Sequence, residues 1–502
     1  MPHVLVIGAG HNALVAAIAL AAHGLEVTVL EQAPRPGGAT TSVQNTLPGF
    51  VHDHCAGFVP MTVASPAMRE LELERDGLEW INPPAVVAHP FADGTAIALH
   101  RDVERTVDSL GAAGAGWAEA MRQLLPLATP LVEAVLAPLP PVRAPLRLAL
   151  ALRRDGLEWA RRLAGSAEAL GLDLFDGDRR ATAWLAGSAQ HSGLSPTAAA
   201  SGAFGLLLQL LGHSHGWPFP RGGMQSLTDA LVRRAEREGA TIRCGAEVEQ
   251  VLVGGGRVKG VRLAGGEDVP ADAVVSTVTA GLLARLLPAG ALPGRLQRRL
   301  RIWRYGTGPF KIDYALSGPV PWTAPEARSS AVVHVAGELE DLTRAADEAR
   351  RGEVPEHPAL VVGQQSLHDA TRAPAGQHSL YVYSHVPSRY AMEDEAVAER
   401  IETQLERLAP GFSSLVLARS TRSPEQTERE NPSLVGGDLA GGSYEIDQQL
   451  IFRPAPQLSR YRSPLRGLYV AGASTHPGGA VHGMSGRGAA RALLRDQRLR
   501  RV

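Results

Sequence analysis

Two short apolar runs near the start of the chain flank an alanine-rich stretch with helical spacing. The runs cover residues 3–7 and 26–31, and residues 14–23 between them carry small and apolar side chains up to Gly24, where the helix is expected to end. Valine and threonine are prominent in the second run, as they are in β-strands. The pattern predicts a strand–helix–strand unit within about 30 residues.

The hydrophobic pattern changes between residues 102 and 211, where leucine, alanine and arginine dominate and strand signals are scarce. Proline disrupts helix interiors, so the prolines in this stretch predict short helices. They stand at positions 126, 130, 138, 140, 141 and 145. We expect a helical region here.

Strand-like and helical segments alternate through the rest of the chain. Residues 225–238 have an amphipathic helical pattern, and the glycines between the strand-like runs 248–253 and 257–263 predict a hairpin. Further strands are expected at 273–276, 310–315, 330–335, 359–363, 380–385 and 468–472, and further helices at 394–408 and 485–495. The alternation predicts an α/β fold class, α+β overall.

Length and composition indicate the class of molecule. A chain of 502 residues is too long for one ordinary core, so we expect two or three substructures. Hydrophobic residues make up 44% and charged residues 20%, which is typical of a well-packed globular protein. The formal net charge of −1 gives no overall positive field, so no nucleic-acid partner is expected.

Cysteine usage and targeting signals indicate the compartment. Cys55 and Cys244 are too few for a disulfide framework, and no Cys-x-x-Cys pair serves redox exchange or zinc binding. The chain start lacks a basic signal-peptide region, and no run of about 20 apolar residues occurs. We expect a cytoplasmic protein. The arginines at positions 143, 147, 153 and 154 among leucines leave open a peripheral contact with a membrane.

A glycine-rich turn follows the first predicted strand and precedes the first predicted helix. Gly8 allows the tight turn, Gly10 lets the backbone approach a pyrophosphate, and Ala13 is small enough for close helix–strand packing. Glu31 ends the second strand, where a carboxylate accepts from a ribose 2′-hydroxyl and repels a 2′-phosphate. These residues predict a dinucleotide site. An ordinary glycine-rich turn of an α/β protein is the alternative interpretation.

A second glycine pair lies close behind the ribose carboxylate. Gly37 and Gly38 follow Arg35 and precede Ala39 and Thr40. Glycine lets a backbone pass close to a ligand, so a further approach to the same cofactor is expected here. The pattern Glu-x-x-x-Arg-x-Gly-Gly resembles FAD-binding flavoproteins of the glutathione-reductase-like and amine-oxidase group.

The chain as a whole resembles the phytoene-desaturase-like branch of FAD-dependent oxidoreductases, and within it the proteins with a pyridine-nucleotide-disulfide oxidoreductase domain. The matching stretches are GAGHNALVAAIALAAHGLEVTVLEQAPRPGGATT, PFPRGGMQSLTDAL, FKIDYALSGPVPW, HSLYVYSHVP and GLYVAGASTHPGGAVHGMSGRGAARALL. The resemblance implies a Rossmann-type FAD-binding domain assembled from residues 1–85, 218–290 and 455–502. Residues 86–217 would form a helical substrate or lid region, and residues 291–454 a mixed sheet and helix substrate domain.

The resemblance also implies FAD as the cofactor and a set of residues that hold it. These are Gly8, Gly10, Ala13, Glu31, Gln32, Arg35, Gly37, Gly38, Ala39, Thr40, Gly222, Gly223, Met224, Val248, Gly472, Ala473, Gly479, Val481 and His482. Ala39 departs from the family's pattern, where a basic residue is common, and Ala473 stands where amine oxidases often carry an aspartate. Neither Lys259 nor Lys311 lies in a motif expected to face the flavin. That absence argues against an amine-oxidase mechanism with a flavin-bridging lysine.

The loop before the last helix supplies the candidate catalytic groups, His476 and His482. For each, an ordinary hydrogen-bonded histidine is the alternative interpretation. The glycines near them, at positions 478, 479, 483, 486 and 488, predict backbone close to the flavin ring. The amides at the start of the next helix are expected to face that ring. A substitution at Gly486 is expected to leave the fold intact.

Two histidine pairs, His52 with His54 and His213 with His215, have the composition of metal ligands. Neither pair has a third ligand in a recognisable spacing. No metal site is therefore expected.

The leading functional hypothesis is an FAD-dependent oxidoreductase that dehydrogenates or desaturates a hydrophobic small molecule by hydride transfer to flavin N5. One dinucleotide fingerprint without a redox cysteine pair points to oxygen or a quinone as the electron acceptor. A redox-neutral flavin-dependent polyene isomerase and a non-catalytic FAD-binding interaction protein are the alternatives. The oligomeric state is not predicted.

Overall fold

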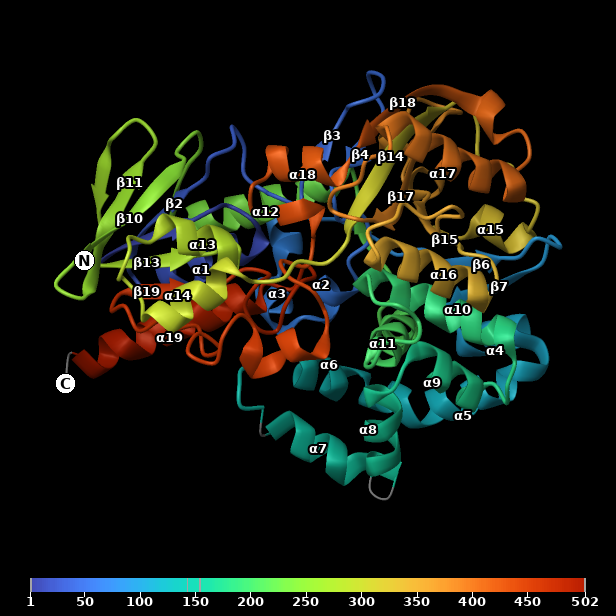
Figure 1. Cartoon of the computed structure of the whole chain (residues 1–502), viewed down its shortest axis with the longest axis horizontal. Coiled ribbons are helices and arrows are strands. Elements are labelled where there is room, and N and C mark those ends of the chain that lie inside the picture. The colour runs from blue at the N-terminus through green and yellow to red at the C-terminus, as the bar shows by residue number, and fades with distance from the viewer. Residues whose placement is uncertain (1, 142, 153–154, 501–502) are drawn as a thin grey trace.

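Two separate β-sheets organise the chain, and helices cover them (Figure 1). The computed structural model describes residues 2–141, 143–152 and 155–500. In Figure 1 the smaller sheet lies on the left with both chain ends, the larger sheet lies at the upper right, and a group of helices lies below it. The predicted fold class is confirmed.

The smaller sheet is parallel and has the strand order β19-β13-β1-β2-β9. Its strands are β1 (His3–Ile7), β2 (Glu26–Leu30), β9 (Thr241–Arg243), β13 (Ala273–Ser276) and β19 (Leu468–Val470). Val4 of β1 pairs with Val27 on one side and Ala273 on the other. Three segments far apart in the sequence therefore form one sheet, and its strands all end at the same edge.

Both faces of the smaller sheet are buried. Side chains such as Leu14 and Leu231 fill one face, and side chains such as Leu5 and Leu283 fill the other. Fully burying one such leucine stabilises the fold by about 1.5–3 kcal/mol. The covering elements are α1 (His11–Ala21), α12 (Met224–Arg237) and α19 (Met484–Arg500) on the first face, and α13 (Ala280–Leu286), α14 (Gly294–Arg301), β10 (Val248–Gly254), β11 (Arg257–Leu263) and β12 (Asp268–Pro270) on the second. The predicted hairpin is the antiparallel pair β10–β11.

The larger sheet has the order β18-β14-β17-β16-β15-β6-β7, and β15 with β6 is its parallel pair. The strands are β6 (Ala85–Pro90), β7 (Ala96–His100), β14 (Gly308–Leu316), β15 (Val332–Val335), β16 (Leu360–Gly363), β17 (His378–Val386) and β18 (Val416–Arg422). β18 is absent from the sequence-based expectation because most of its side chains are partly exposed, which leaves no clear apolar run.

β6 and β7 correct the expected nature of residues 86–217. That region is expected to be helical, but its first part extends the larger sheet. β6 is buried at every position. Its sequence therefore lacks the polar alternation that marks a half-exposed strand.

The rest of that region is helical, as predicted. Its helices are α4 (Val103–Leu110), α5 (Gly114–Leu124), α6 (Ala128–Leu136), α7 (Arg143–Leu152), α8 (Gly156–Ala164), α9 (Ala167–Leu174), α10 (Arg179–Ala189) and α11 (Ser201–Ser214). They share a core with Val87 and Val332 of the larger sheet. In that core the rings of Trp117 and Trp184 meet edge to face with centroids 5.1 Å apart.

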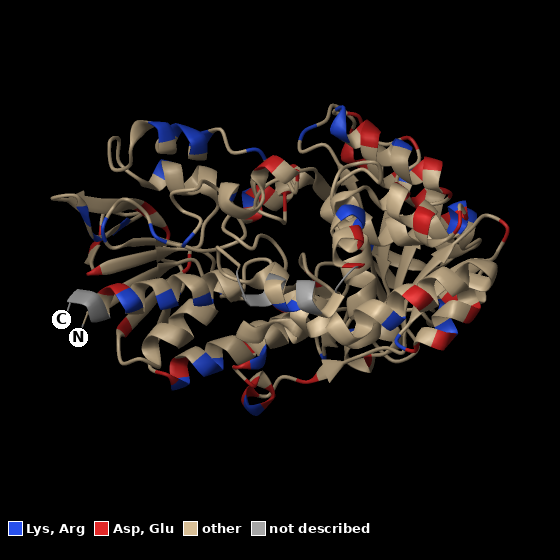
Figure 2. Ribbon diagram, turned by 90° about the horizontal axis from the view of Figure 1, so that it is seen from below, with Lys and Arg blue, Asp and Glu red and all other residues tan. Residues whose placement is uncertain are grey.

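Short strands and helices complete the fold. They are β3 (Ser42–Val43) paired with β4 (His52–Asp53), β5 (Trp80–Ile81) paired with β8 (Phe219–Pro220), α2 (Pro60–Ala64), α3 (Pro66–Arg69), α15 (Pro325–Ser329), α16 (Leu339–Arg350), α17 (Asp394–Leu408) and α18 (Pro424–Glu430). Acidic and basic residues are interspersed over the outer elements (Figure 2). Within the described ranges, no helix is long and apolar enough to cross a bilayer. Arg153 and Arg154, two of the arginines noted above, lie outside the described residues.

Candidate active site

The turn between β1 and α1 has the geometry of a phosphate cradle. Gly8 has φ +91°, a left-handed conformation that favours glycine, and its N–H donates to the Leu30 carbonyl at 2.8 Å. Gly10 begins α1 without any side-chain cap, which leaves backbone amides of the first turn available. A Cβ atom at position 10 would meet nothing within 4 Å, so the space beside these amides is open.

The second glycine pair lies directly against this turn. The Gly37 N–H donates to the Ala9 carbonyl at 3.0 Å, and Gly38 lies beside the Cα of Gly10. Thr40 fixes the loop, because its hydroxyl donates to the Gly37 carbonyl at 2.7 Å. Two sequence motifs separated by more than 25 residues thus form one cradle.

Glu31 closes the cradle at the end of β2. Its carboxylate is 8% exposed and accepts from the Ala9 N–H at 2.7 Å and from the Ala33 N–H at 2.9 Å. The Ala246 N–H donates to the Glu31 carbonyl at 2.8 Å, which brings the segment that leads into Val248 alongside. Open space, free amides and an oriented carboxylate fit the diphosphate and ribose of FAD.

Other predicted cofactor residues lie around the cradle. Ala13 is buried in α1, Gln32 is exposed, and the guanidinium of Arg35 donates to the Ser42 carbonyl at 2.8 Å. At the edge of the sheet, Gly472 has φ +87°, and a Cβ there would lie 2.2 Å from the Thr277 carbonyl oxygen. The contact of each with FAD stays a prediction.

Two amides of the segment Gly222–Met224 are hydrogen-bonded within the protein. The Gly222 N–H donates to Asp369 at 2.8 Å, and the Met224 N–H donates to Asp53 at 2.7 Å. Arg372 joins the two carboxylates with contacts of 3.0 and 3.2 Å, and all three charged side chains are 1% exposed. The amides of Gly222 and Met224 therefore hold a buried ion network, and contact of this segment with FAD stays a prediction.

Several glycines near the C-terminus pack against protein on the side where a Cβ would lie, and their contact with the flavin ring stays a prediction. A Cβ at Gly486 would lie 1.9 Å from the Asn12 carbonyl oxygen, so α19 crosses α1 at this glycine. At Gly488 the added atom would lie 2.3 Å from the Tyr461 ring, and at Gly479 it would lie 2.6 Å from the Tyr444 hydroxyl. The expectation that a substitution at Gly486 leaves the fold intact is therefore wrong.

His482 caps α19, and its predicted catalytic role does not fit this geometry. Its Nδ1 accepts from the Met484 N–H at 3.0 Å, so Nε2 carries the proton and donates to the Gly478 carbonyl at 3.2 Å. Burial, together with the nearby His11 ring, lowers the pKa of His482 to about 3. Both ring nitrogens are occupied within the protein, and the imidazole is neutral at physiological pH.

Three further predicted residues surround that cap. His476 Nε2 donates to the Ala137 carbonyl at 2.8 Å, which ties the loop to the end of α6, and burial lowers the pKa of His476. The Val481 carbonyl accepts from the Thr62 hydroxyl at 2.5 Å, and the Ala473 carbonyl accepts from Arg453 at 3.0 Å. The catalytic role of His476 stays a prediction.

A small cavity adjoins the cradle, and we call it the inner cavity. Its volume is about 10 Å³, which is room for one small group. Its wall carries His54 and Cys55, whose segment is held to the cradle by the His54 N–H on the Thr41 carbonyl at 2.8 Å. The other lining residues are Pro309, Lys311, Tyr383, Arg422, Thr427 and Leu439.

Lys311 lies in this wall, so one of the two lysines lines the cavity beside the cradle although no sequence motif marks it. Its side chain pairs with Asp313, and the ammonium lies 5.5 Å from the centroid of the Tyr381 ring. Burial lowers the pKa of Lys311, and the Asp313 carboxylate opposes part of that shift. Burial raises the pKa of Asp313, but Lys311 and His52 outweigh it and bring the pKa below the ordinary value. A lone lysine in the apolar strand β14 is the signal that could have indicated this site.

The two free cysteines and the two histidine pairs are the candidates for a reactive thiol site and for a metal site. Burial raises the pKa of the Cys55 thiol, and burial also raises that of Cys244. Among the described residues, no group of three His, Cys, Asp or Glu side chains is placed to hold a metal ion.

A family comparison supplies the identity of this arrangement. The family described as flavin-containing amine oxidoreductase matches residues 14–494. The chain belongs to this family. With a cradle that fits FAD, the protein is an FAD-dependent oxidoreductase.

Relatives within the family agree with the predicted branch. The chain is 29% identical to rat pyridine nucleotide-disulfide oxidoreductase domain-containing protein 2, over 98% of this chain and 93% of the relative. It is 29% identical to all-trans-zeta-carotene desaturase of Myxococcus xanthus, over 95% and 90% of the two chains. It is also 29% identical to hydroxyneurosporene desaturase of Cereibacter sphaeroides, over 99% and 98%. The predicted resemblance is confirmed.

Solved structures of other proteins share the fold. An oxidoreductase from Methanosarcina mazei superposes with a TM-score of 0.63 at 17% identity, over 98% of this chain and 100% of the other. A triple mutant of putrescine oxidase superposes with a TM-score of 0.65 at 16% identity, over 99% of each chain. At this identity the likeness concerns the fold alone.

Proposed function

We propose that this flavoenzyme dehydrogenates a carbon–carbon single bond of a hydrophobic small molecule that reaches the inner cavity. The observation that carries the proposal is the position of Lys311, which lies buried in a cavity joined by backbone hydrogen bonds to the FAD cradle. Bound FAD supplies the acceptor for a hydride at N5. The similar desaturases of Myxococcus xanthus and Cereibacter sphaeroides support a dehydrogenation of this kind.

The residues of the chain supply binding and proton transfer. Pro309, Tyr383 and Leu439 give the inner cavity largely apolar walls, which exclude water from the reacting bond. One carbon of the substrate loses a hydride. Lys311 transfers its proton to the paired Asp313 carboxylate, and the neutral Nζ then accepts a proton from the neighbouring carbon. The electron pair of that second C–H bond becomes the new double bond. The lowered pKa of Lys311 favours the neutral amine that this step requires.

Oxidation of a carbon–nitrogen bond is the second candidate, and the same lysine favours it. A cationic amine would meet the charge of a protonated Lys311, whereas the lowered pKa of Lys311 reduces this repulsion. The family match to amine oxidoreductases supports this candidate as well.

We further propose oxygen or a quinone as the electron acceptor. The sequence has one dinucleotide fingerprint and no Cys-x-x-Cys pair, so it offers neither a second nucleotide site nor a dithiol relay. Contact with a membrane stays a proposal for the surface of α7 and α8, where Leu146 is 58% and Leu157 is 83% exposed.

The test is an anaerobic titration of the purified holoenzyme with a panel of terpenes and alkylamines. A dehydrogenase loses its oxidised flavin absorbance with one substrate per flavin, and the product is two hydrogens lighter. Bleaching by a terpene supports the leading proposal, and bleaching by amines alone replaces it with the second candidate. Turnover of a terpene to an isomer of equal mass, seen only with dithionite-reduced enzyme, contradicts both.

A further inference from the structure

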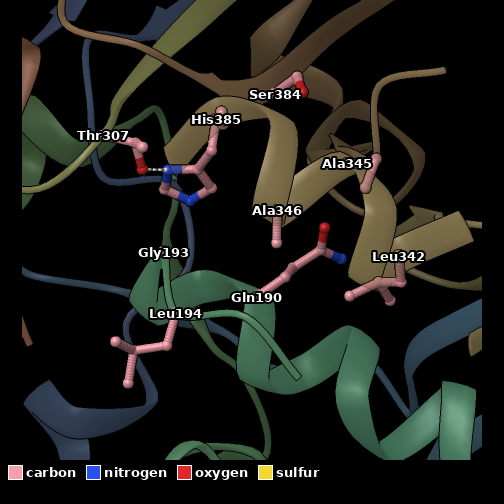
Figure 3. Close-up of a pocket in the computed structure, with 11 residues that line it drawn as sticks. Gln190, Gly193, Leu194, Thr307, Leu342, Ala345, Ala346, Ser384 and His385 are labelled. Atoms are coloured by element: carbon pink, nitrogen blue, oxygen red, sulfur yellow. Dashed lines mark hydrogen bonds between the residues drawn. The ribbon is translucent and has the colours of Figure 1, made fainter. Parts of the chain in front are cut away.

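A second pocket lies beside the inner cavity, and both are lined by residues of β17 (Figure 3). We call it the outer pocket. Its volume is about 30 Å³, which is room for one functional group rather than for a whole molecule, and it shares Gly193 and Thr307 with a larger pocket of about 400 Å³. Most of its wall is apolar, with Leu342 and the alanines of α16 on one side and Leu194 on another. Such a wall suits a hydrocarbon skeleton.

Four polar side chains interrupt this apolar wall: Gln190, Thr307, Ser384 and His385. Gln190 is 7% exposed, and its Nε2 has no hydrogen-bond partner among the residues that the structure describes. His385 donates or accepts through Nδ1 at the Thr307 hydroxyl, 3.2 Å away, and its Nε2 makes no hydrogen bond of ordinary geometry within the same ranges. Figure 3 shows the Gln190 amide near Ala346 and the His385 ring on the other side of the pocket.

A buried N–H donor without a partner is unfavourable unless a ligand or a water accepts its hydrogen bond. The Gln190 amide N–H matches an acceptor, and the oxygens of ketones and alcohols are acceptors that an otherwise apolar molecule can carry. Burial lowers the pKa of His385 to about 4, so its ring is neutral and would present no charge to such an oxygen.

The outer pocket is continuous in the sheet with the inner cavity. His385 and Tyr383 stand two residues apart on β17 and therefore on the same face, with ring centroids 5.8 Å apart. On the neighbouring strand, Pro309 pairs with His385 and Lys311 pairs with Tyr383. The residue pair at the outer pocket, Pro309 with His385, is thus next on this face of the sheet to the pair that contains Lys311.

We propose that the outer pocket binds the oxygen-bearing end of an apolar substrate, with Gln190 Nε2 donating to a carbonyl or hydroxyl oxygen. The substrate class is then an oxygenated hydrocarbon rather than a pure hydrocarbon. This inference rests on the proposed function for its chemistry, but the binding itself is independent of flavin reduction.

Isothermal titration calorimetry of the holoenzyme tests the pocket with three probes of one carbon skeleton: menthone, menthol and p-menthane. We expect menthone and menthol to bind about tenfold more tightly than p-menthane. In Gln190→Leu this preference disappears while p-menthane affinity is kept. The matched control Gln297→Leu changes a buried glutamine of α14, far from the lining residues, and keeps the preference.

Equal or tighter binding of p-menthane by the wild type, or a preference that survives in Gln190→Leu, would overturn the proposal. The absence of binding by all three probes would overturn it as well. A preference that holds in an enzyme whose flavin no substrate reduces would leave the pocket assignment intact and remove the proposed dehydrogenation.

Discussion

Lys311 and Asp313 form an ion pair on one face of β14, with side chains only 5% and 3% exposed. Asn45 also donates to the Asp313 carboxylate, at 2.9 Å, and His52 lies 3.7 Å from it. Taking two charges out of water is unfavourable, and each charge in this pair depends on the other. A pair of this kind at the wall of the inner cavity is better explained by chemistry than by stability.

Loss of one partner should therefore destabilise the protein. Lys311→Met leaves the Asp313 carboxylate buried without its cation, and we expect a loss of about 3–5 kcal/mol in the free energy of unfolding. The double variant Lys311→Met/Asp313→Asn should recover most of that loss. Urea unfolding of both, with Lys259→Met as the exposed-lysine control, measures it. A single variant within 1 kcal/mol of wild type would contradict the buried pair.

Gly10→Leu should yield a folded protein without FAD. The side chain would enter the open space beside the α1 amides, where the pyrophosphate is expected, and its Cβ meets nothing within 4 Å. Gly294→Leu is the matched control, because a Cβ there also meets nothing within 4 Å. Absorbance of flavin released from the purified proteins gives the result. If Gly10→Leu keeps its full flavin content, the diphosphate of FAD does not bind beside the α1 amides.

Gly486→Ala should destabilise the fold by about 1–3 kcal/mol, because its Cβ has no room at the crossing of α1 and α19. Gly294→Ala has open space and should lie close to wild type. Thermal or urea unfolding of the two variants distinguishes them. Equal stability would show that the helices separate at this crossing without strain.

The cap on α19 should make stability depend on pH. The pKa of His482 is about 3 in the folded protein and about 6.5 when unfolded, so the unfolded chain binds the extra proton. Its contribution is fully present above pH 6.5 and is lost as the pH falls toward 3. Between pH 7.5 and 5.5 the wild type should lose about 1.4 kcal/mol more than His482→Asn. Urea unfolding at the two pH values gives the difference, and equal losses would remove this role of His482.

The local parts of the site are readable in the sequence. Gly8, Gly10 and Glu31 lie within one strand–helix–strand unit, whose spacing fixes their mutual positions, and Gly37 lies only a few residues beyond it. The order of helices and strands in the larger sheet also follows from hydrophobic patterns, apart from the fully buried β6, the largely buried β7 and the partly exposed β18.

The parts of the site that join residues far apart in the sequence could not be predicted from local patterns. The ion network of Asp53, Asp369 and Arg372 joins residues more than 300 positions apart, and no motif marks any of them. The inner cavity likewise needs the pairing of β14 with β17 before Lys311 meets Tyr383. The five glycines near the C-terminus predict a nearby ligand. Sequence alone does not distinguish a glycine that approaches a ligand from one that lets two helices cross, as Gly486 does.

Anaerobic stopped-flow absorbance of the flavin tests the central claim most directly. Wild type, Lys259→Met and Lys311→Met/Asp313→Asn are each mixed with the terpene that bleaches the wild type, after equal FAD content is verified. We predict equal rates of flavin reduction for wild type and Lys259→Met. The rate for the double variant should be lower by a factor of roughly 100 or more, because the proton acceptor is lost. Flavin reduction at the wild-type rate in the double variant would contradict the assignment of Lys311 and the inner cavity to catalysis.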